Sequence, residues 1–432
     1  MEAICERMPL LPFPLVVPAE TLKHPARFAM KKVSALILGH IVVLGFLVFL
    51  MNVMAIASLH VYDRLGPLEN YPEAYLLPNY QGAAWAQKHF VEINELDAPY
   101  MSYYGWRRSP YIGETINVDG RGLRRTYRDQ RASPERTIAF FGGSTMWGSG
   151  ADDNWTIPSE FIKLNPEYVG YNFGESGYVA HQSLNVFLEW YFEGFRPDVV
   201  VFYDGVNEVW VKCQYQLGPY SHWSEAEVRS TLRESRAARA ERGATVTESV
   251  LALVQPVRSF IDRALPRIRR KLGYDQAAEA SYHDCHTNPE KAEQVARVLL
   301  SDWLIVKDLV ESYGGTFVPI LQPVIYASKT RTDHLTVSEA LGWQFETVYP
   351  LIVDLLHREF PELAGNIMDL RDAVDRDEYI YIDWCHLSPN GNQLVGERIS
   401  QGVAARTDKA LAARSGPDRA ELNSHRMRTR TE

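Results

Sequence analysis

One uninterrupted apolar run, Val199–Tyr203, constrains the fold more than any other part of the sequence. The run follows Pro197 and ends at Asp204-Gly205. A strand that faces solvent on one side alternates apolar and polar residues, and this run does not alternate. Strands of this kind lie in the centre of parallel sheets that helices cover on both faces. The run therefore predicts a layered α/β fold.

Strands and helices alternate along the chain on both sides of that run. Apolar runs of strand length occur at Ile138–Phe141, Tyr168–Phe173 and Thr316–Leu321, and helical spacing occurs at Gln182–Phe192 and Lys291–Tyr313. This alternation is typical of a parallel sheet with helical crossovers. We expect a doubly wound parallel sheet in an α/β/α sandwich over residues 135–405.

A second apolar stretch, Val33–Leu59, predicts one transmembrane helix before the sandwich. His40 and Asn52 are its main polar interruptions, and it is long enough to cross a hydrocarbon core about 30 Å thick with some tilt. Ala55-Ile56-Ala57 resembles a cleavage site, but the run is too long and starts too late for a typical signal peptide. We therefore expect an uncleaved helix at residues 33–59.

Basic residues indicate the orientation of this helix. Lys23, Arg27, Lys31 and Lys32 precede it closely, whereas only Arg64 follows closely. Positive charge is retained on the cytoplasmic side of a membrane. Residues 1–32 are therefore expected in the cytoplasm, and the sandwich is expected outside the cell membrane, in the periplasm or the extracellular space.

The remaining segments are interpreted from their composition. Residues 60–134 are rich in aromatic residues and prolines, which suits a membrane-proximal segment. A helical insertion is expected at about 211–289, and the arginine-rich end, 406–432, is expected to be disordered. Within the insertion, Ser224–Arg242 predicts a solvated helix. Val246–Leu272 is basic and amphipathic, and it fits either a lid packed on the domain or a helix lying on a membrane.

Charge and cysteine spacing exclude some function classes. The net charge of −9 over 432 residues argues against nonspecific nucleic-acid binding, which needs a basic face. The four cysteines form no CxxC pair, and the cluster His283–His286 consists of adjacent residues, which rarely point at one ion. We expect no metal site and no cofactor.

The positions of the cysteines also predict one disulfide bond. Cys213 and Cys285 both lie in the insertion, in a compartment expected to be oxidising, and we predict a disulfide between them. Cys5 is expected to be reduced in the cytoplasm, and Cys385 to be a small packing residue.

The strand Ile138–Phe141 runs directly into Gly142-Gly143-Ser144-Thr145. Two glycines allow a sharp turn at the end of a strand. Ser144 then lies at the carboxyl end of the sheet, where open α/β sheets place their ligands. Taken alone, the stretch favours a turn with a capping serine over a nucleophile.

Asp383 and His386, near the C-terminus, are the partners that a nucleophilic serine needs. They precede Ser388-Pro389, which predicts the start of a final helix. In a tight turn, the carboxylate of Asp383 can accept the Nδ1–H of His386. The Nε2 atom is then free to take a proton from a serine hydroxyl. A DxxH pattern alone is equally consistent with a structural histidine.

Taken together, four blocks in this order resemble those of the SGNH (GDSL-type) hydrolases. The blocks are Gly142–Thr145, Asn172–Gly177, Gly205–Glu208 and Asp383–His386. The resemblance covers about Thr137–Ala404 apart from the insertion, and it implies the same sandwich fold.

Two positions depart from the family pattern. Gly143 stands where GDSL members have Asp, as in a membrane-anchored bacterial subset, and Glu208 stands where many members have Asp. Neither position belongs to the triad, but both leave the closest subfamily and the substrate open.

The resemblance also implies roles for individual residues. Ser144 would be the nucleophile, His386 the general base and then the general acid, and Asp383 the carboxylate that orients it. The oxyanion would be held by the backbone N–H groups of Ser144 and Gly177 and by the side chain of Asn207.

These features together predict a membrane-anchored serine esterase that acts outside the cytoplasmic membrane. The expected substrates are esters, above all acetyl or other acyl groups on cell-surface or extracellular glycans. Hydrolysis and acyl transfer share an acyl-enzyme, and the sequence does not separate them. Trp147, Trp155 and Trp223 fit either sugar-stacking platforms or simple packing.

Two other function classes compete with this prediction. One is a catalytically silent protein for glycan binding or polysaccharide assembly on the same fold. A nucleotide-binding protein is the weaker alternative, because Gly148-Ser149-Gly150 lacks the full GxGxxG pattern and no GK[ST] follows the strand. The sequence indicates no protein partner and no oligomeric state.

Overall fold

The computed structural model describes residues 24–64, 74–240, 257, 261 and 282–415. The chain divides into two compact units. The described residues of the first unit are helix α1, His24–Arg64, together with residues 257 and 261. The second unit contains all other described residues, including the predicted sandwich.

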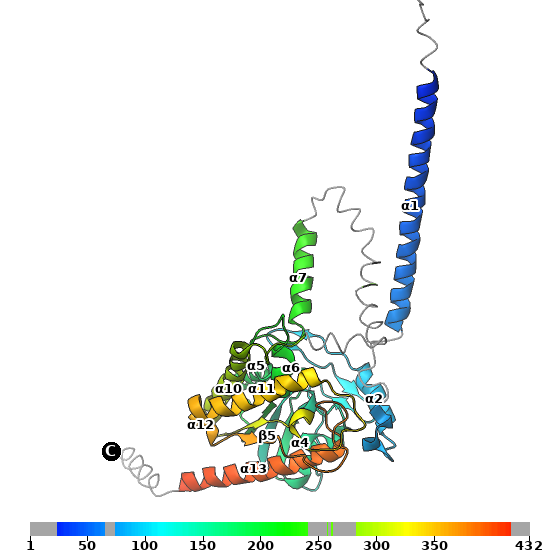
Figure 1. Cartoon of the computed structure of the whole chain (residues 1–432). Helices are drawn as coiled ribbons and strands as arrows, with labels where there is room; N and C mark the ends of the chain where they lie inside the picture. Colours follow the sequence, from blue (N-terminus) through cyan, green and yellow to red (C-terminus); the bar gives the residue numbers. More distant parts are fainter. Residues whose placement is uncertain (1–23, 65–73, 241–256, 258–260, 262–281, 416–432) are drawn as a thin grey trace, which may run out of the picture. The chain divides into compact units, whose positions relative to one another are not determined.

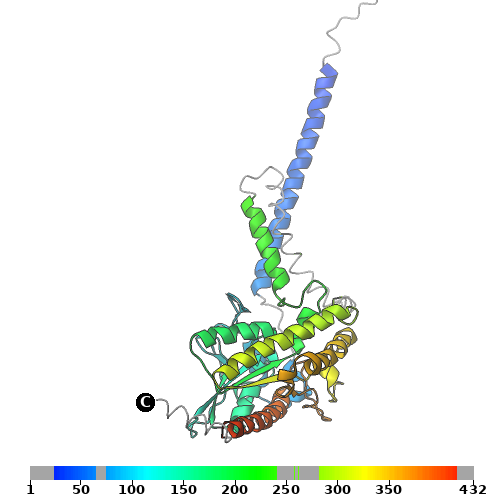
Figure 2. The same ribbon diagram turned by 90° about the vertical axis from the view of Figure 1, so that its left-hand side faces the viewer.

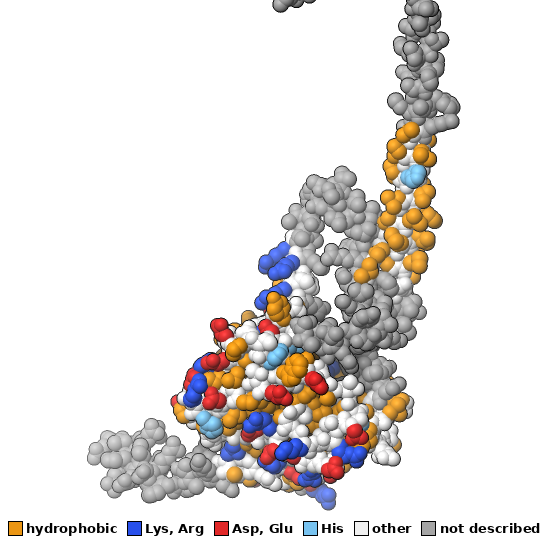
Figure 3. All heavy atoms as spheres, in the orientation of Figure 1, with side chains coloured by type: hydrophobic (Ala, Val, Ile, Leu, Met, Phe, Trp, Pro, Cys, Tyr) orange, Lys and Arg blue, Asp and Glu red, His pale blue; other side chains and the backbone are white. Residues whose placement is uncertain are grey.

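Helix α1 is long and apolar enough to cross a membrane. Its stretch Ala35–Ser58 has a mean hydropathy of 2.5, and its hydrophobic side chains are exposed along the helix (Figure 3). His40 Nδ1 lies 2.7 Å from the carbonyl oxygen of Leu36, and Asn52 Nδ2 donates to that of Val48 at 2.9 Å. The two polar interruptions therefore find partners within the helix, as a hydrocarbon environment requires.

The second unit is built on a five-stranded parallel sheet. The strands are β5 (Arg136–Gly142), β6 (Tyr168–Asn172), β7 (Val199–Asp204), β8 (Thr316–Leu321) and β9 (Met368–Asp369), in the spatial order β6-β5-β7-β8-β9. Every residue of the central strand β7 is buried. The apolar run that constrains the fold is therefore the middle of the sheet, as predicted.

Alternate residues of each strand point into two separate cores. Ala139 and Phe141 of β5 pack with the helices α5 (Ala180–Phe192), α6 (Val206–Lys212), α10 (Pro289–Ser312) and α11 (Glu339–Glu359). Ile138 and Phe140 pack on the opposite face with α4 (Ile157–Leu164) and α13 (Pro389–Ser415). The sheet is thus covered on both faces (Figure 1, Figure 2), and the predicted α/β/α sandwich is confirmed.

Capping residues decide where several helices begin. The side chain of Asn288 accepts the backbone N–H of Lys291 at 3.2 Å, and Pro289 takes the first helical position of α10. Ser338 caps α11 in the same way. These are the start signals that capping and proline preferences favour.

Shorter elements complete the described fold. They are the helices α2 (Ala86–Glu95), α3 (Ser144–Trp147), α7 (Glu225–Ala240) and α12 (Pro361–Ala364), the antiparallel pairs β1–β2 (Tyr100–Met101, Gly105–Trp106) and β3–β4 (Tyr111–Ile112, Asn117–Val118), and the 3₁₀ turns Ala74–Leu76, Pro78–Tyr80, Asp153–Trp155 and Ile325–Ala327.

The described part of the segment 60–134 packs on the sandwich. Phe90 and Ile93 of α2 share a core cluster with Trp147 and Ile382, which lie near the candidate site. The buried carboxylate of Glu92 accepts three backbone N–H groups of the loop 114–116. Residues 74–134 and the sandwich consequently form one compact unit.

Helix α13 corrects the expected start of the disordered tail. The helix continues to Ser415, past residue 406. Arg406 donates to the backbone carbonyl groups of Asn366 and Ile367 at 2.9 and 3.0 Å, and Thr407 is buried. The sequence shows these residues only as polar, because their partners lie far away in the chain. Residues 416–432 lie outside the described residues.

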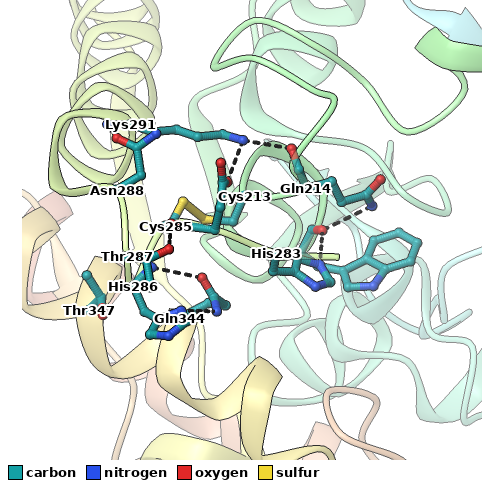
Figure 4. The surroundings of a disulfide bond; sticks show 12 residues. Cys213, Gln214, His283, Cys285, His286, Thr287, Asn288, Lys291, Gln344 and Thr347 are labelled. Carbon is teal, nitrogen blue, oxygen red and sulfur yellow. Dashed lines mark hydrogen bonds and ion pairs between the residues drawn. A yellow bond between two sulfur atoms is a disulfide. The ribbon is translucent and has the colours of Figure 1, made fainter. Parts of the chain in front are cut away.

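A disulfide joins the two ends of the insertion, which confirms the predicted pairing of Cys213 with Cys285 (Figure 4). Cys213 follows α6 and Cys285 precedes α10. Beside the disulfide, Lys291 Nζ donates to the carbonyl oxygen of Gln214 and contacts Asp284 Oδ1, both at 2.7 Å.

Of the other predictions for the insertion, one concerns described residues and one falls mostly outside them. Helix α7, Glu225–Ala240, matches the solvated helix expected at Ser224–Arg242. The amphipathic stretch Val246–Leu272 lies outside the described residues except for Val257 and Ile261. Cys5 also lies outside them, whereas Cys385 is buried, as a packing residue is.

Candidate active site

Ser144 lies where the connections of the sheet diverge. β5 pairs with β6 on one side and with β7 on the other, and the helices that follow β5 and β7 cover opposite faces. In sheets with this strand order, a crevice opens at the carboxyl ends of those two strands. Ser144 begins α3 just after β5, and Asn207 lies in the first turn of α6 just after β7.

His386 connects Ser144 to Asp383 by two short hydrogen bonds. Ser144 Oγ lies 2.6 Å from His386 Nε2, and His386 Nδ1 lies 2.6 Å from Asp383 Oδ2. With Nδ1 protonated toward the carboxylate, Nε2 is an acceptor for the serine hydroxyl. The structure thus brings these three predicted site residues together.

The carboxylate of Asp383 also shapes its own loop. Its Oδ1 atom accepts the backbone N–H groups of Cys385 and His386 at 2.8 and 2.7 Å. Burial raises the pKa of Asp383, but the charge of His386 and these hydrogen bonds outweigh burial, so the net pKa lies below its ordinary value. Asp383 therefore stays ionised and holds the imidazole in one orientation.

The amide of Asn207 sits in a space that Gly143 leaves open. Asn207 Nδ2 donates to the carbonyl oxygen of Tyr178 at 2.7 Å. A Cβ atom added to Gly143 would lie 2.3 Å from Asn207 Nδ2. The φ angle of Gly143 is −79°, which any residue can adopt, so the glycine is needed for space alone. In this chain, a larger residue at position 143 would therefore displace the amide of Asn207.

Gly177 lies in a loop that several side chains hold in place. Its φ angle of 73° is a left-handed conformation that favours glycine. Trp106 Nε1 donates to the carbonyl oxygen of Ser176 at 2.9 Å. The guanidinium of Arg108 lies 3.2 Å from the fully buried carboxylate of Glu175. The loop that carries Gly177 is therefore fixed from the segment 104–108.

Glu208 links the loop that carries Gly177 to the first turn of α6, which carries Asn207. Its buried carboxylate accepts the backbone N–H of Gly205 at 2.8 Å and that of Ala180 at 2.6 Å. The second departure from the family pattern thus has a structural role, because this carboxylate ties the start of α6 to the start of α5.

Residues from all four blocks converge at the carboxyl ends of β5 and β7. Ser144, Asn207 and the His386–Asp383 pair meet there, and the loop of Gly177 borders them through Tyr178. The structure thus brings together the four blocks on which the resemblance of the sequence rests.

Sequence reasoning missed a second set of residues around this candidate site. Five consecutive carbonyl groups, those of residues 147–151, follow the short helix that Ser144 begins. Arg124 donates to the carbonyl oxygens of residues 147, 148 and 151, His89 Nε2 lies 2.9 Å from that of residue 149, and Tyr80 donates to that of residue 150 at 2.6 Å. We call Tyr80, His89 and Arg124 the donor brace.

No signal in the sequence marks the donor brace. Its three residues are spread over the aromatic-rich segment before the sandwich, outside the four family blocks. All three are buried, and Arg124 also forms an ion pair with Asp153 at 3.0 Å. Only the fold shows that this segment supports the loop behind Ser144.

The three tryptophans proposed as sugar platforms differ in their surroundings. Trp147 is fully buried, and the guanidinium groups of Arg108 and Arg124 lie over its ring. Of the two interpretations of this residue, packing is therefore the correct one. Trp155 is 42% exposed, but Lys163 Nζ lies 3.7 Å from its ring centroid. Trp223 is 52% exposed and borders Gly177.

Two clusters offer the residue types of a metal site. Asp383, Cys385 and His386 have donor atoms within 4.8 Å of one another, but burial, followed by the charge of Asp383, raises the pKa of the Cys385 thiol well above its ordinary value. The carboxylate of Asp383 and both ring nitrogens of His386 are already engaged in the hydrogen bonds described above. In the other cluster, 283–286, Cys285 is in the disulfide, and the rings of His283 and His286 contact Trp210 and Gln344.

Known structures resemble this chain at low sequence identity. A carbohydrate acetylesterase family member from Sinorhizobium meliloti is 17% identical, with 63% of this chain and 99% of that chain covered and a TM-score of 0.32. A second carbohydrate acetylesterase from the same organism is 13% identical, with 63% and 99% covered and a TM-score of 0.34. A member of the lipolytic G-D-S-L family from Veillonella parvula is 10% identical, with 61% and 96% covered and a TM-score of 0.34. No family model and no curated protein sequence matches the chain.

Proposed function

We propose that the protein is a serine ester hydrolase anchored in the membrane by α1. The observation that carries the proposal is the hydrogen-bonded chain from Ser144 Oγ through His386 to Asp383. A serine hydroxyl is a weak nucleophile until an adjacent base accepts its proton. His386 Nε2, at 2.6 Å, is in position to be that base.

The proposed reaction has two halves that share an acyl-enzyme. Ser144 Oγ attacks the carbonyl carbon of the ester while His386 Nε2 takes the hydroxyl proton. The imidazolium, paired with Asp383, then gives this proton to the leaving alcohol as the C–O bond breaks. In the second half, water gives a proton to His386 Nε2 as its oxygen attacks the carbonyl carbon of the acyl-enzyme. His386 then returns this proton to Ser144 Oγ as the bond between Oγ and the acyl carbon breaks, which releases the acid and the free serine.

Three donors are proposed to hold the oxyanion of each tetrahedral intermediate. They are the backbone N–H groups of Ser144 and Gly177 and the side-chain amide of Asn207. One hydrogen of Asn207 Nδ2 is used by the carbonyl oxygen of Tyr178, which leaves the second hydrogen for the oxyanion. Such donors act on charge that develops in the transition state.

The catalytic domain is proposed to face the outside of the cytoplasmic membrane. The basic residues that precede the apolar stretch Ala35–Ser58 of α1 support this orientation; they are Lys23, Arg27, Lys31 and Lys32. The Cys213–Cys285 disulfide also supports it, because disulfides persist in oxidising compartments. Acyl groups on cell-surface or extracellular glycans, acetyl groups above all, are the esters that we propose as substrates there.

Labelling and substrate comparison test the proposal directly. The full-length chain in detergent is treated with a fluorophosphonate probe, with Ser144→Ala as the control. We expect the probe to label the wild type but not Ser144→Ala. In a separate assay, we expect the unlabelled wild type to release acetate from O-acetylated oligosaccharides. An unlabelled but folded wild type would favour the silent glycan-binding alternative. Acetate transfer to an added sugar in place of release would identify an acyltransferase.

A further inference from the structure

Four tryptophans form a continuous aromatic group beside the candidate site. We call Trp106, Trp210, Trp223 and Trp384 the tryptophan shelf. Trp223 stacks on Trp210 with ring centroids 6.3 Å apart and an interplanar angle of 29°. The ring centroids of Trp210 and Trp384 lie 6.2 Å apart, and those of Trp223 and Trp106 lie 6.2 Å apart in an edge-to-face pair. These separations lie within the range of attractive aromatic pairs.

The shelf borders both sides of the proposed catalytic machinery. A Cβ atom added to Gly177 would lie 3.3 Å from Trp223 Cδ1 and 3.5 Å from Trp106 Cζ2. Trp384 lies in the sequence between Asp383 and Cys385, in the loop of the proposed base. The shelf therefore extends from the proposed oxyanion donor Gly177 to the loop that carries Asp383 and His386.

Within the shelf, only Trp223 presents a large surface to solvent. Trp106 is 8% exposed, whereas Trp223 is 52% exposed. Its other neighbours support it, because Trp210 covers one side of the ring and Trp106 meets it at 83°. An exposed indole held in place by other indoles is a rigid apolar platform that loses little entropy when a ligand covers it.

We propose that Trp223 is the platform on which a sugar ring of the acylated glycan stacks. This rests on the proposed esterase function and specifies where its substrate binds. A pyranose has apolar C–H faces and a polar rim, so it fits a flat aromatic face with polar groups around it. Tyr220 and His222 lie in the same loop as Trp223, and the exposed Tyr220 can donate to such a rim.

Binding to an inactive background tests the platform apart from turnover. The probe is a partially O-acetylated xylo-oligosaccharide, titrated by calorimetry into the full-length Ser144→Ala protein in detergent. Adding Trp223→Ala should weaken binding by on the order of tenfold, the loss of about 1.4 kcal/mol of contact. Trp223→Tyr keeps an aromatic face and should restore most of the affinity.

Trp343→Ala is the matched control for loss of an exposed indole. Trp343 is 45% exposed, and its ring contact is with His286 next to the disulfide. This variant should bind the oligosaccharide as tightly as Ser144→Ala alone. Thermal unfolding of each variant shows whether the fold is kept.

Other outcomes would overturn the platform. Equal affinity with and without Trp223, or no binding of the oligosaccharide at all, would refute it. Weaker binding of p-nitrophenyl octanoate together with unchanged binding of the oligosaccharide would assign Trp223 to the acyl chain instead. Wild-type labelling by the fluorophosphonate reports on the esterase separately, so the failure of one proposal is distinguishable from failure of the other.

Discussion

Asp383 has two tasks that need different oxygen atoms. Oδ1 accepts two backbone N–H groups of its own loop, and Oδ2 accepts the ring of His386. A carboxylate can do both because it has only acceptors. At the scale of single residues, the proposed chemistry therefore depends on groups that touch no substrate.

Asp383→Asn should uncouple these two tasks. If the amide oxygen keeps the backbone N–H groups, the NH₂ end faces His386 Nδ1 and donates to it. The imidazole then carries its proton on Nε2 and cannot accept the proton of Ser144. We expect kcat for p-nitrophenyl acetate to fall by about 10⁴, as a wrong tautomer causes in serine hydrolases.

The control for this substitution is Asp372→Asn. Asp372 pairs with Arg398 at 3.5 Å and its side chain is 70% exposed, so kcat should not change. Wild-type kcat in Asp383→Asn would show that the tautomer of His386 is held by something else.

Gly143→Ala should act through Asn207. The backbone of Gly143 accepts alanine, but the added methyl group would lie 2.3 Å from Asn207 Nδ2 and displace it. We expect a loss in kcat of about 10²–10³, the cost of one oxyanion donor, with little change in KM. The double variant Gly143→Ala/Asn207→Ala should be no worse than Asn207→Ala alone. Additive losses would contradict this coupling.

At the scale of elements, α2 and the turns and loops on either side of it support the turn behind Ser144. The donor brace satisfies the carbonyl groups of residues 147–151, and the segment 104–108 holds the loop of Gly177. Buried carbonyl groups without donors are costly. The segment before the sandwich therefore stabilises the loops of the candidate site and is more than a spacer.

His89 makes this brace sensitive to acid. Burial, and next the charge of Arg124, lowers the pKa of His89 from 6.5 to about 3. Between these values the unfolded chain binds a proton that the folded chain does not, so stability falls as pH falls through this window. From pH 6.5 to 5, His89 should account for a loss of about 1.5 kcal/mol.

His89→Gln tests this contribution because glutamine keeps an N–H donor without titrating. The unfolding free energies of the wild type and the variant are compared at pH 6.5 and pH 5. The variant should lose less stability on acidification. An identical loss in both proteins would mean that His89 is not the group responsible.

At the scale of the whole molecule, the chain has two compact units with different environments. The first contains an exposed apolar helix, whereas the second has two cores around a central sheet. An exposed helix of this composition is stable in hydrocarbon and not in water. The proposed arrangement places a membrane between the N-terminus and the sandwich.

Protease accessibility tests that arrangement. Protease added to intact spheroplasts should digest the chain after Leu59 and leave an N-terminal epitope tag protected. The physical reason is the positive charge that precedes the apolar stretch Ala35–Ser58 of α1. Permeabilised spheroplasts, in which both sides are digested, serve as the control. A sandwich protected in sealed spheroplasts would refute the proposed export.

The sequence by itself determined four of the five strands of the sheet, the layer order and the candidate Ser144, Asp383 and His386. Local signals suffice for these, because burial on both faces removes polar alternation from β5, β7 and β8, and because each block lies at a strand end or before a helix. The sequence did not mark the edge strand β9 or the pairs β1–β2 and β3–β4, whose two-residue strands are too short to show a pattern. The pairing of Cys213 with Cys285 also followed from the chain, since the two residues border one insertion.

Only the tertiary structure decided which side chains meet across long separations. Arg406 is a tail residue in the sequence, and only the fold places carbonyl groups beside it. The donor brace, the room that Gly143 leaves for Asn207, and the burial of Trp147 beside the exposed Trp223 depend in the same way on distant contacts. Such contacts leave no periodicity in a sequence, because the pattern of a helix or strand reports burial and not the partner.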